Sequence, residues 1–384
     1  MSVFSETPEK RARLETEFDR FHVCSDKQLF RNAYKNMLYN RKFALVSDTI
    51  TYCDSNAENG ILFSKSSCHA SRVVNTLYAF ESIFKEGEKI LNEVTNTDGY
   101  IPQDEQTKTL LLPLLTFLLD KESQETLRSL SAKVENETEL MITLGTHLFS
   151  KLAVSKDFTV DKYAANKACL CICGKCERKQ VYTFDDTSVG HRKVWHGNVD
   201  IILESCDIGV HCTPVEERSP GAEVKFCDMN SFMVRDQILA QTITFSFLQQ
   251  QRHPAMKHFL IPSILASCKG VQFFFYDSRN DILLESRPFE FFYPDSEEKL
   301  LNYQAVIAIW LVVNYKYLCS GPTKSILDAP KANFPRFAGD ALEIYKSQLR
   351  FRNVSETGEE EELPDVLWSK ITNGLYDDVP LEKD

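Results

Sequence analysis

The sequence predicts an α/β fold whose central part runs helix, three strands, helix, strand. Two observations lead to this prediction. Apolar residues recur at helical spacing over residues 135–152 and again over residues 230–251. Between these two segments, short apolar stretches of the kind found in strands occur at residues 180–184, 194–204 and 222–227.

The elements that follow complete the predicted sheet and cover it. Residues 271–276 and 282–285 have the composition of further strands. The apolar stretch 297–318 predicts a helix that packs over the sheet. After Pro322 the composition turns polar and acidic, and residues 355–363 are most simply a solvated tail.

The N-terminal part is predicted to be helical. Periodic apolar segments at residues 8–21, 71–94 and 105–119 predict helices, and Pro113 should kink the last of them or mark a second start. The expected domains are a helical N-terminal region at residues 1–122, a central domain at residues 123–330, and a C-terminal helix with an acidic tail at residues 331–384.

The net charge and the cysteine content indicate which kinds of protein and which cellular compartment to expect. A formal net charge of −11 argues against a protein that coats nucleic acid, because broad phosphate binding needs a surplus of Lys and Arg on one face. It does not exclude a nuclease, since a carboxylate-lined site is anionic until metal enters. The 12 cysteines are spread over a long chain with no apolar signal segment at its start, which favours a reducing compartment.

No membrane span is expected from the hydropathy of the chain. The longest uninterrupted apolar run, residues 305–313, is far shorter than the roughly 20 residues that cross a bilayer. We therefore expect a soluble intracellular protein, nuclear or cytoplasmic, without a membrane partner.

Asp200 lies in the second predicted strand of the central part. Side chains alternate along a strand, so Val199, Ile201 and Leu203 are expected to share one face. Asp200 is then expected on the opposite face.

The third predicted strand repeats this arrangement. Ala222, Val224 and Phe226 should point into the core, which leaves Glu223 and Lys225 side by side on the other surface. If the two strands pair, the side chains of Asp200, Glu223 and Lys225 converge.

Such a convergence suits phosphodiester hydrolysis with Mg²⁺ or Mn²⁺. A hard divalent ion takes oxygen ligands and retains waters, and Asp200, Glu223 and the carbonyl of Val224 offer these oxygens. The ion lowers the pKa of a bound water and offsets phosphate charge, while Lys225 orients that water or stabilises the developing anion.

These motifs resemble those of PD-(D/E)xK nucleases, most of all the RecB-type exonuclease domains. Gly197 precedes the metal-binding Asp200, and Glu223-Val224-Lys225 forms the acidic-x-lysine strand. The family's Gln-x-x-x-Tyr helix is matched at Gln241, whereas Phe245 replaces the tyrosine and loses its hydroxyl.

The resemblance covers residues 135–285 and implies a restriction-endonuclease-like core. It also implies a catalytic set made of Asp200, Glu223, Lys225 and Gln241. The family's first helix often carries a glycine, a histidine and an acidic ligand. His147 comes earlier than that pattern requires, and Glu139 reaches the site only if its helix is suitably placed, so neither receives a role.

A group of cysteines has two interpretations. Cys169, Cys171, Cys173 and Cys176 offer four thiols in a short loop, a donor set for zinc or an iron–sulfur cluster. Their spacing differs from paired CxxC knuckles, since Cys173 and Cys176 alone form one. Small buried cysteines on a strand are therefore the favoured interpretation.

Other polar and aromatic residues near the motif also have two interpretations. His191, His196 and His211 are close enough in sequence to assist phosphate binding, but a lone histidine is more often structural or simply exposed. A modest basic patch, with two aromatic residues that can stack on bases or pack in the core, comprises Lys175, Arg178, Lys179, Arg192, Lys193, Tyr182 and Trp195.

The function expected from the sequence is metal-dependent cleavage of DNA, of an exonuclease-like kind, with DNA as the partner. The N-terminal helical region would position substrate or a protein partner. One rival is a catalytically inactive nuclease fold that binds nucleic acid or protein. Another is a helical interaction protein in which the motif is accidental.

Overall fold

The structure is a computed structural model that describes Thr16 and residues 26–39, 43–97, 102–166, 171–176, 182–203, 208–213, 232–293 and 299–354. The chain divides into two compact units, and all of these residues belong to the first, Met1–Val354. The second unit, Ser355–Asp384, lies outside the described residues, and so does the predicted solvated tail.

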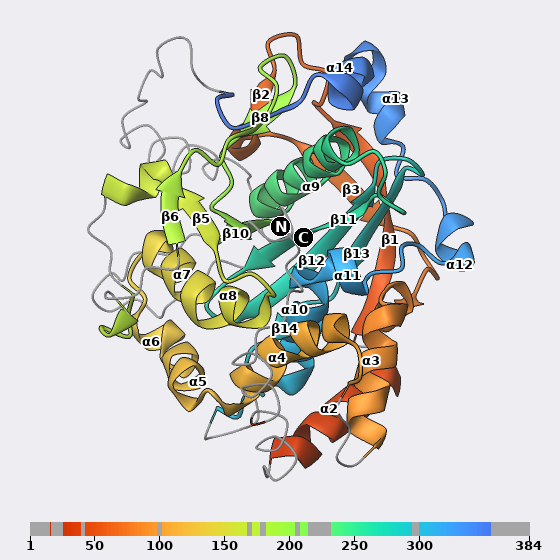
Figure 1. Cartoon of the computed structure of the whole chain (residues 1–384). Helices are drawn as coiled ribbons and strands as arrows, with labels where there is room; N and C mark the ends of the chain where they lie inside the picture. The colour runs from red at the N-terminus through yellow and green to blue at the C-terminus, as the bar shows by residue number, and fades with distance from the viewer. Residues whose placement is uncertain are drawn as a thin grey trace, which may run out of the picture. The chain divides into compact units, whose positions relative to one another are not determined.

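The predicted α/β class is confirmed, because a mixed sheet runs through the first unit with helices packed against it (Figure 1). Its strands lie in the order β3 (Cys68–Arg72), β1 (Ala44–Cys53), β13 (Ile282–Ser286), β12 (Gly270–Asp277), β11 (Leu260–Ala266), β10 (Ile208–Cys212), β9 (Ile201–Leu203), β5 (Phe158–Asp161) and β6 (Tyr182–Asp185). The short strands β4 (Tyr78–Ala79) and β14 (Phe289–Glu290) pair with β1 and β12. This architecture differs from that of a helical interaction protein.

Successive side chains of the strands point to opposite faces of the sheet and pack into two separate hydrophobic cores. In β12, Phe273 and Phe275 join one core, whereas Phe274 and Tyr276 join the other. The first core is covered by α2 (Asp26–Tyr39), α3 (Lys85–Asn96), α4 (Glu105–Leu119), α7 (Glu137–Leu144) and α10 (Tyr303–Val313). The second core is covered by α9 (Phe232–Arg252), α13 (Phe334–Ala338) and α14 (Leu342–Ser347). Burial on both faces explains why the central strands are apolar almost throughout.

Shorter elements connect and extend these layers. They are α5 (Lys121–Arg128), α6 (Leu130–Lys133), the π-helical turn η4 (Gly145–Phe149), α8 (Ser150–Leu152), α11 (Tyr315–Leu318) and α12 (Lys324–Leu327). A second, small sheet has the strand order β15 (Arg350–Phe351), β7 (Val189–Gly190), β8 (Trp195–Gly197) and β2 (Ile61–Leu62).

A continuous part of the chain from α7 to β11 builds the centre of the large sheet. The helical segment α7–η4–α8 leads into β5, which pairs antiparallel with β9, and β9 pairs antiparallel with β10. Helix α9 then connects β10 to β11, and these two strands are parallel. A parallel pair needs such a crossover, and α9 packs on β11 and β12 as it returns (Figure 1).

The predicted strand 194–204 is broken in two. Gly197 has φ +145°, a conformation that side chains other than glycine rarely adopt, and the chain leaves β8 there and enters β9 at Ile201. The predicted shared face of Val199, Ile201 and Leu203 is wrong as a result. Val199 packs in the core under α9, whereas Ile201 and Leu203 pack in the opposite core.

The third strand of this central part is β10, which the sequence patterns did not predict. The strand predicted at residues 222–227 lies outside the described residues. Strand β10 pairs with β9 on one side and β11 on the other, so both of its edges are occupied.

The N-terminal region is not purely helical. Strand β1 pairs with β13, so the region and the end of the predicted central domain share one sheet. Residues 71–94 were expected to form one helix, but they contain the end of β3, β4, the 3-10 turn η3 (Phe80–Ile83) and the start of α3. Helix α4 has the predicted bounds and contains Pro113.

The last predicted helix, 297–318, is shorter and interrupted. Helix α10 ends before Asn314, and α11 follows. The side-chain amide of Asn314 donates to the carbonyls of Trp310 and Leu152. All side chains of α10 are buried. In the part of the chain that the structure describes, no helix has both the length and the apolar character required to cross a bilayer.

A buried ion network ties α9 to the N-terminal strand. Nη2 of Arg235 lies 2.8 Å from Oδ2 of Asp48 and 2.7 Å from Oε2 of Glu285. Both carboxylates are buried, on β1 and β13. Burial and the neighbouring Glu285 raise the pKa of Asp48, while Arg235 holds the pKa of Glu285 low against the effect of its burial.

We predict that Arg235→Met destabilises the fold by roughly 3–5 kcal/mol, because Asp48 and Glu285 would lose the buried cation they share and Glu285 would keep only the more exposed Arg72. Urea unfolding measures this change. The control is Lys346→Met, since Lys346 pairs with Glu343 on the exposed surface, and its effect should stay within about 0.5 kcal/mol. Equal unfolding midpoints for both variants would contradict the prediction.

Candidate functional site

Asp200 directly precedes β9 and contacts the end of β10. Its Oδ2 accepts a hydrogen bond from the N–H of Cys212 at 2.6 Å and lies 2.9 Å from Nδ1 of His211. The register explains this contact. Ile201 pairs with Val210, so one step further along both strands sets Asp200 opposite His211.

His211 and Asp161 both lie near Asp200, at the corner of the sheet formed by the ends of β5, β9 and β10, and both have shifted pKa values. Burial alone would lower the pKa of His211, but the carboxylate of Asp200 and the more weakly acting Glu137 of α7 raise it. Asp161, at the end of β5, has a pKa raised to about 6 by burial and by the nearby Asp200 and Asp186. Asp161 accepts a hydrogen bond from Asn198 at 2.9 Å. The corner therefore gathers carboxylates from α7, β5 and the start of β9.

The predicted convergence of Asp200, Glu223 and Lys225 falls partly outside the described residues. Glu223, Val224 and Lys225 all belong to the segment that is not described. The side chain next to Asp200 on the neighbouring strand is that of His211, for which the sequence favoured a structural or exposed position over a role in phosphate binding. The sequence contained one indication of this strand, because the apolar residues Ile208, Val210 and Cys212 alternate with Gly209 and His211.

Gln241 lies on α9 and is buried. Its Nε2 has no hydrogen-bond partner among the described residues. One turn later the ring of Phe245 packs on Gly209 of β10, where a Cβ would lie 3.1 Å from the ring. The helix that carries the predicted glutamine therefore faces the strand next to Asp200.

Several neighbouring candidates have structural roles. Oε2 of Glu139 accepts the N–H of Glu135, a local contact at the start of α7. Trp195 is fully buried and its Nε1 donates to Asp54, so it packs rather than stacks on a base. Tyr182 is half-buried with its ring 5.4 Å from that of Phe158.

The remaining basic and histidine candidates are spread out. Nε of Arg192 donates to the carbonyl of Val354, and Lys175 lies 3.2 Å from Glu122 at the surface. His196 contacts the carbonyl of Val194, and Nδ1 of His191 accepts the N–H of Lys193. Arg178 and Lys179 lie outside the described residues, where no basic patch can be assigned.

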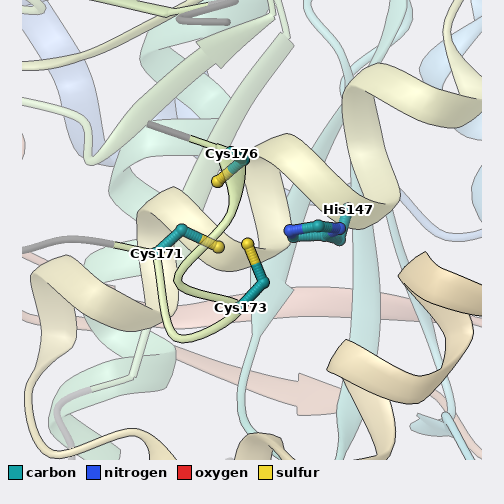
Figure 2. A group of neighbouring side chains, drawn as sticks. All are labelled: His147, Cys171, Cys173 and Cys176. Carbon is teal, nitrogen blue, oxygen red and sulfur yellow. The ribbon is translucent and has the colours of Figure 1, made fainter. Parts of the chain in front are cut away.

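A second group of candidate side chains joins the π-helical turn η4 to residues 171–176. The ligand atoms of His147, Cys171, Cys173 and Cys176 all lie within 4.8 Å of one another. Figure 2 shows the three sulfur atoms and one edge of the imidazole turned toward a common space. Cys169, the fourth cysteine of the sequence motif, lies outside the described residues.

This geometry corrects the favoured interpretation of the cysteines. Residues 171–176 form a turn rather than a strand, and Cys173 and Cys176 are half-buried. The sequence did not single out His147 as their partner, because the two segments are joined only by folding. His147 lies in the π-helical turn η4, an element that often marks functional sites.

His147 is held by a chain of polar contacts. Its Nδ1 lies 3.1 Å from Oγ of Ser123, and this hydroxyl donates to Oδ2 of Asp120 at 2.9 Å. Nζ of Lys151 lies 2.9 Å from the same carboxylate oxygen. Burial, and then the ammonium of Lys151, lower the pKa of His147.

The comparisons with known proteins identify no relative. No family model matches the chain, no curated protein matches it, and no solved structure matches it.

We predict that Asp200→Ala destabilises the fold by roughly 1–3 kcal/mol, because the N–H of Cys212 would lose its acceptor inside the protein. Asp200→Asn keeps an acceptor oxygen at this position and should stay within about 1 kcal/mol of the parent protein. Urea unfolding of both variants tests this. The control Asp340→Ala, at an exposed position, should change stability by less than about 0.5 kcal/mol. An Asn variant as unstable as the Ala variant would be the contrary result.

Proposed function

We propose that the protein is a metal-dependent nuclease of the PD-(D/E)xK type that hydrolyses phosphodiester bonds of DNA, in an exonuclease-like manner. The observation that carries this proposal is the order of elements from α7 to β11, with Asp200 at the start of the second strand. Strands β6, β7 and β8 also lie between β5 and β9 in the chain, but β6 is at the edge of the large sheet and β7 and β8 belong to the small sheet. The remaining strands β5, β9 and β10, between α7 and α9, support the order helix, three strands, helix, strand that the sequence resemblance implies. The antiparallel β5–β9–β10 and the parallel β11 support a restriction-endonuclease-like core.

The segment that contains Glu223 and Lys225 starts beside Asp200. It connects β10 to α9, and β10 ends at Cys212, whose N–H binds the Asp200 carboxylate. Glu223 and Lys225 therefore follow the strand next to Asp200 rather than belonging to it. The proposal requires this connection to return both side chains to Asp200.

Asp200 is suited to bind a cation. Both of its contacts with β10 use Oδ2, so Oδ1 accepts no hydrogen bond from the described residues. The neighbouring carboxylates of Asp161 and Glu137 add negative charge that a cation would offset. We propose that Asp200, Glu223 and the carbonyl of Val224 hold Mg²⁺ or Mn²⁺.

In the proposed reaction, the metal ion, Lys225 and Gln241 would each have a separate role. When bound, the divalent ion would acidify a water and offset charge on the scissile phosphate. Lys225 would orient the attacking water and stabilise the negative charge of the transition state. Gln241 is buried and its Nε2 has no hydrogen-bond partner among the described residues, so it would be available to position the segment that carries Glu223 and Lys225.

One observation favours a second candidate, an inactive nuclease fold that binds nucleic acid. The strand position opposite Asp200 holds His211, whose Nδ1 lies 2.9 Å from Oδ2 of Asp200, so the imidazole competes with a metal ion for this carboxylate oxygen. A protein of this kind would bind DNA without cleaving it.

For the test, the purified protein is incubated with end-labelled single- and double-stranded DNA, with Mg²⁺, with Mn²⁺ and without either. We predict metal-dependent cleavage that falls by at least about 100-fold in Asp200→Asn and Lys225→Ala. The Asn substitution is chosen because it keeps the Cys212 contact, so lost activity cannot be assigned to unfolding.

Asp340→Asn and Lys346→Ala make the same chemical changes at exposed positions and should retain full cleavage. DNA binding without cleavage would establish the inactive fold instead. Cleavage that survives both site substitutions would refute the assignment of the site.

A further inference from the structure

We propose that His147, Cys171, Cys173 and Cys176 bind one structural zinc ion, which fastens the turn 171–176 to the helical segment α7–η4–α8. The site is separate from the proposed nuclease centre in both residues and chemistry. Zinc favours sulfur and nitrogen donors, whereas Mg²⁺ takes oxygen donors.

The size of the donor group fits one tetrahedral ion. Zinc lies about 2.3 Å from thiolate sulfur and about 2.0 Å from imidazole nitrogen, which separates neighbouring sulfur donors by about 3.8 Å. The four donor atoms already lie within 4.8 Å of one another. Side-chain movements of less than about 1 Å close the site around an ion.

The polar contacts of His147 fix which ring nitrogen is available. The Ser123 hydroxyl gives its hydrogen to Asp120, so toward His147 it acts as the acceptor. Nδ1 of His147 therefore carries the ring hydrogen and donates it to Ser123. Nε2 is left with its lone pair, and this buried atom has no hydrogen-bond partner among the described residues. A histidine held through a serine and a carboxylate has the second-shell support found around metal ligands.

The turn that carries the cysteines is shaped to present sulfur atoms. Gly174 has φ +64°, which bends the chain between Cys173 and Cys176. The N–H of Lys175 lies 3.4 Å from Sγ of Cys173, and the hydroxyl of Thr143 lies 3.7 Å from Sγ of Cys171. A thiolate can only accept, so the Thr143 hydroxyl would donate to Cys171 once this thiol is deprotonated, and such donors stabilise the form in which cysteine binds metal.

A set of three thiols and one imidazole indicates a structural ion. All four positions of a tetrahedral zinc ion would be filled by protein, so none remains for a reactive water. Binding would convert the three thiols to thiolates and release their protons to solvent. The ion would hold the turn against η4, and so stabilise the helical segment whose first turn carries Glu137.

The main test is the zinc content of the full chain, purified with a phosphine reductant, without a histidine tag and without chelator. We expect about one zinc per chain by inductively coupled plasma mass spectrometry, as one four-ligand site requires. Cys173→Ser and His147→Ala should each bind less than about a fifth of that amount. Cys268→Ala, at a buried cysteine outside the group, should keep full zinc content.

Cys169→Ser separates an imidazole from a fourth thiol as the remaining ligand. The proposal requires this variant to retain zinc while His147→Ala loses it. The reverse pattern would overturn the assignment of His147. Ser123→Ala should weaken zinc binding by roughly 10-fold or more without abolishing it, because it removes the support of the ring and no ligand.

A measurement on the unmodified protein avoids variants that fail to fold. A mercurial reagent that blocks thiols should release zinc, detected by a colorimetric chelator, and removal of zinc should lower the thermal unfolding midpoint. Less than about 0.1 zinc per chain after growth and refolding with added ZnCl2 would overturn the proposal. So would iron with acid-labile sulfide, or a disulfide among the three cysteines under reducing conditions. None of these readouts depends on DNA cleavage.

Discussion

The pairing of β10 with β9 on one edge and with β11 on the other is the constraint on which the rest of the structure depends. Because β10 and β11 are parallel, the chain has to cross from one end of the sheet to the other, and α9 makes that crossing. Because β9 and β10 are antiparallel, Asp200 lies opposite His211 and binds the N–H of Cys212. Moving this register by one residue would turn the side chains of β10 to the other face and break the Asp200 contact.

Helix α9 connects the two halves of the chain because it is buried almost all around. Its apolar residues fill the core on one face of the sheet, and Phe245 packs on Gly209 of β10. Near its start, Arg235 pairs with Asp48 of β1 and Glu285 of β13, two side chains distant in sequence. The N-terminal strand is therefore held to the central elements by sheet pairing and by a buried cation. A helical extension packed from outside would lack both restraints.

The two candidate centres share the segment α7–η4–α8. Glu137 of α7 adds negative charge to the corner around Asp200, and His147 of η4 faces the three cysteines. The oxygen-rich corner suits a hard, exchangeable cation, and the thiol cluster suits a borderline-soft ion that stays bound. If both proposals hold, a bound zinc ion would stabilise the same helical segment that contributes negative charge to the nuclease centre.

The sequence by itself determined the α/β class and the positions of α4 and α9. Residues 105–119 and 230–251 repeat apolar side chains over several turns. Only a helix buries apolar side chains at this spacing together, so α4 and α9 occur as predicted. It also singled out Asp200, whose contacts make it the centre of the β5–β9–β10 corner. Short strands were less predictable, since the five residues of β10 carry too little pattern to be distinguished from a turn.

Tertiary structure alone decided that Val199 and Ile201 enter opposite cores and that His211 faces Asp200. It also decided that His147 meets three cysteines more than twenty residues further along the chain. Such contacts depend on strand order and helix packing, which bring together residues whose local patterns contain no information about one another.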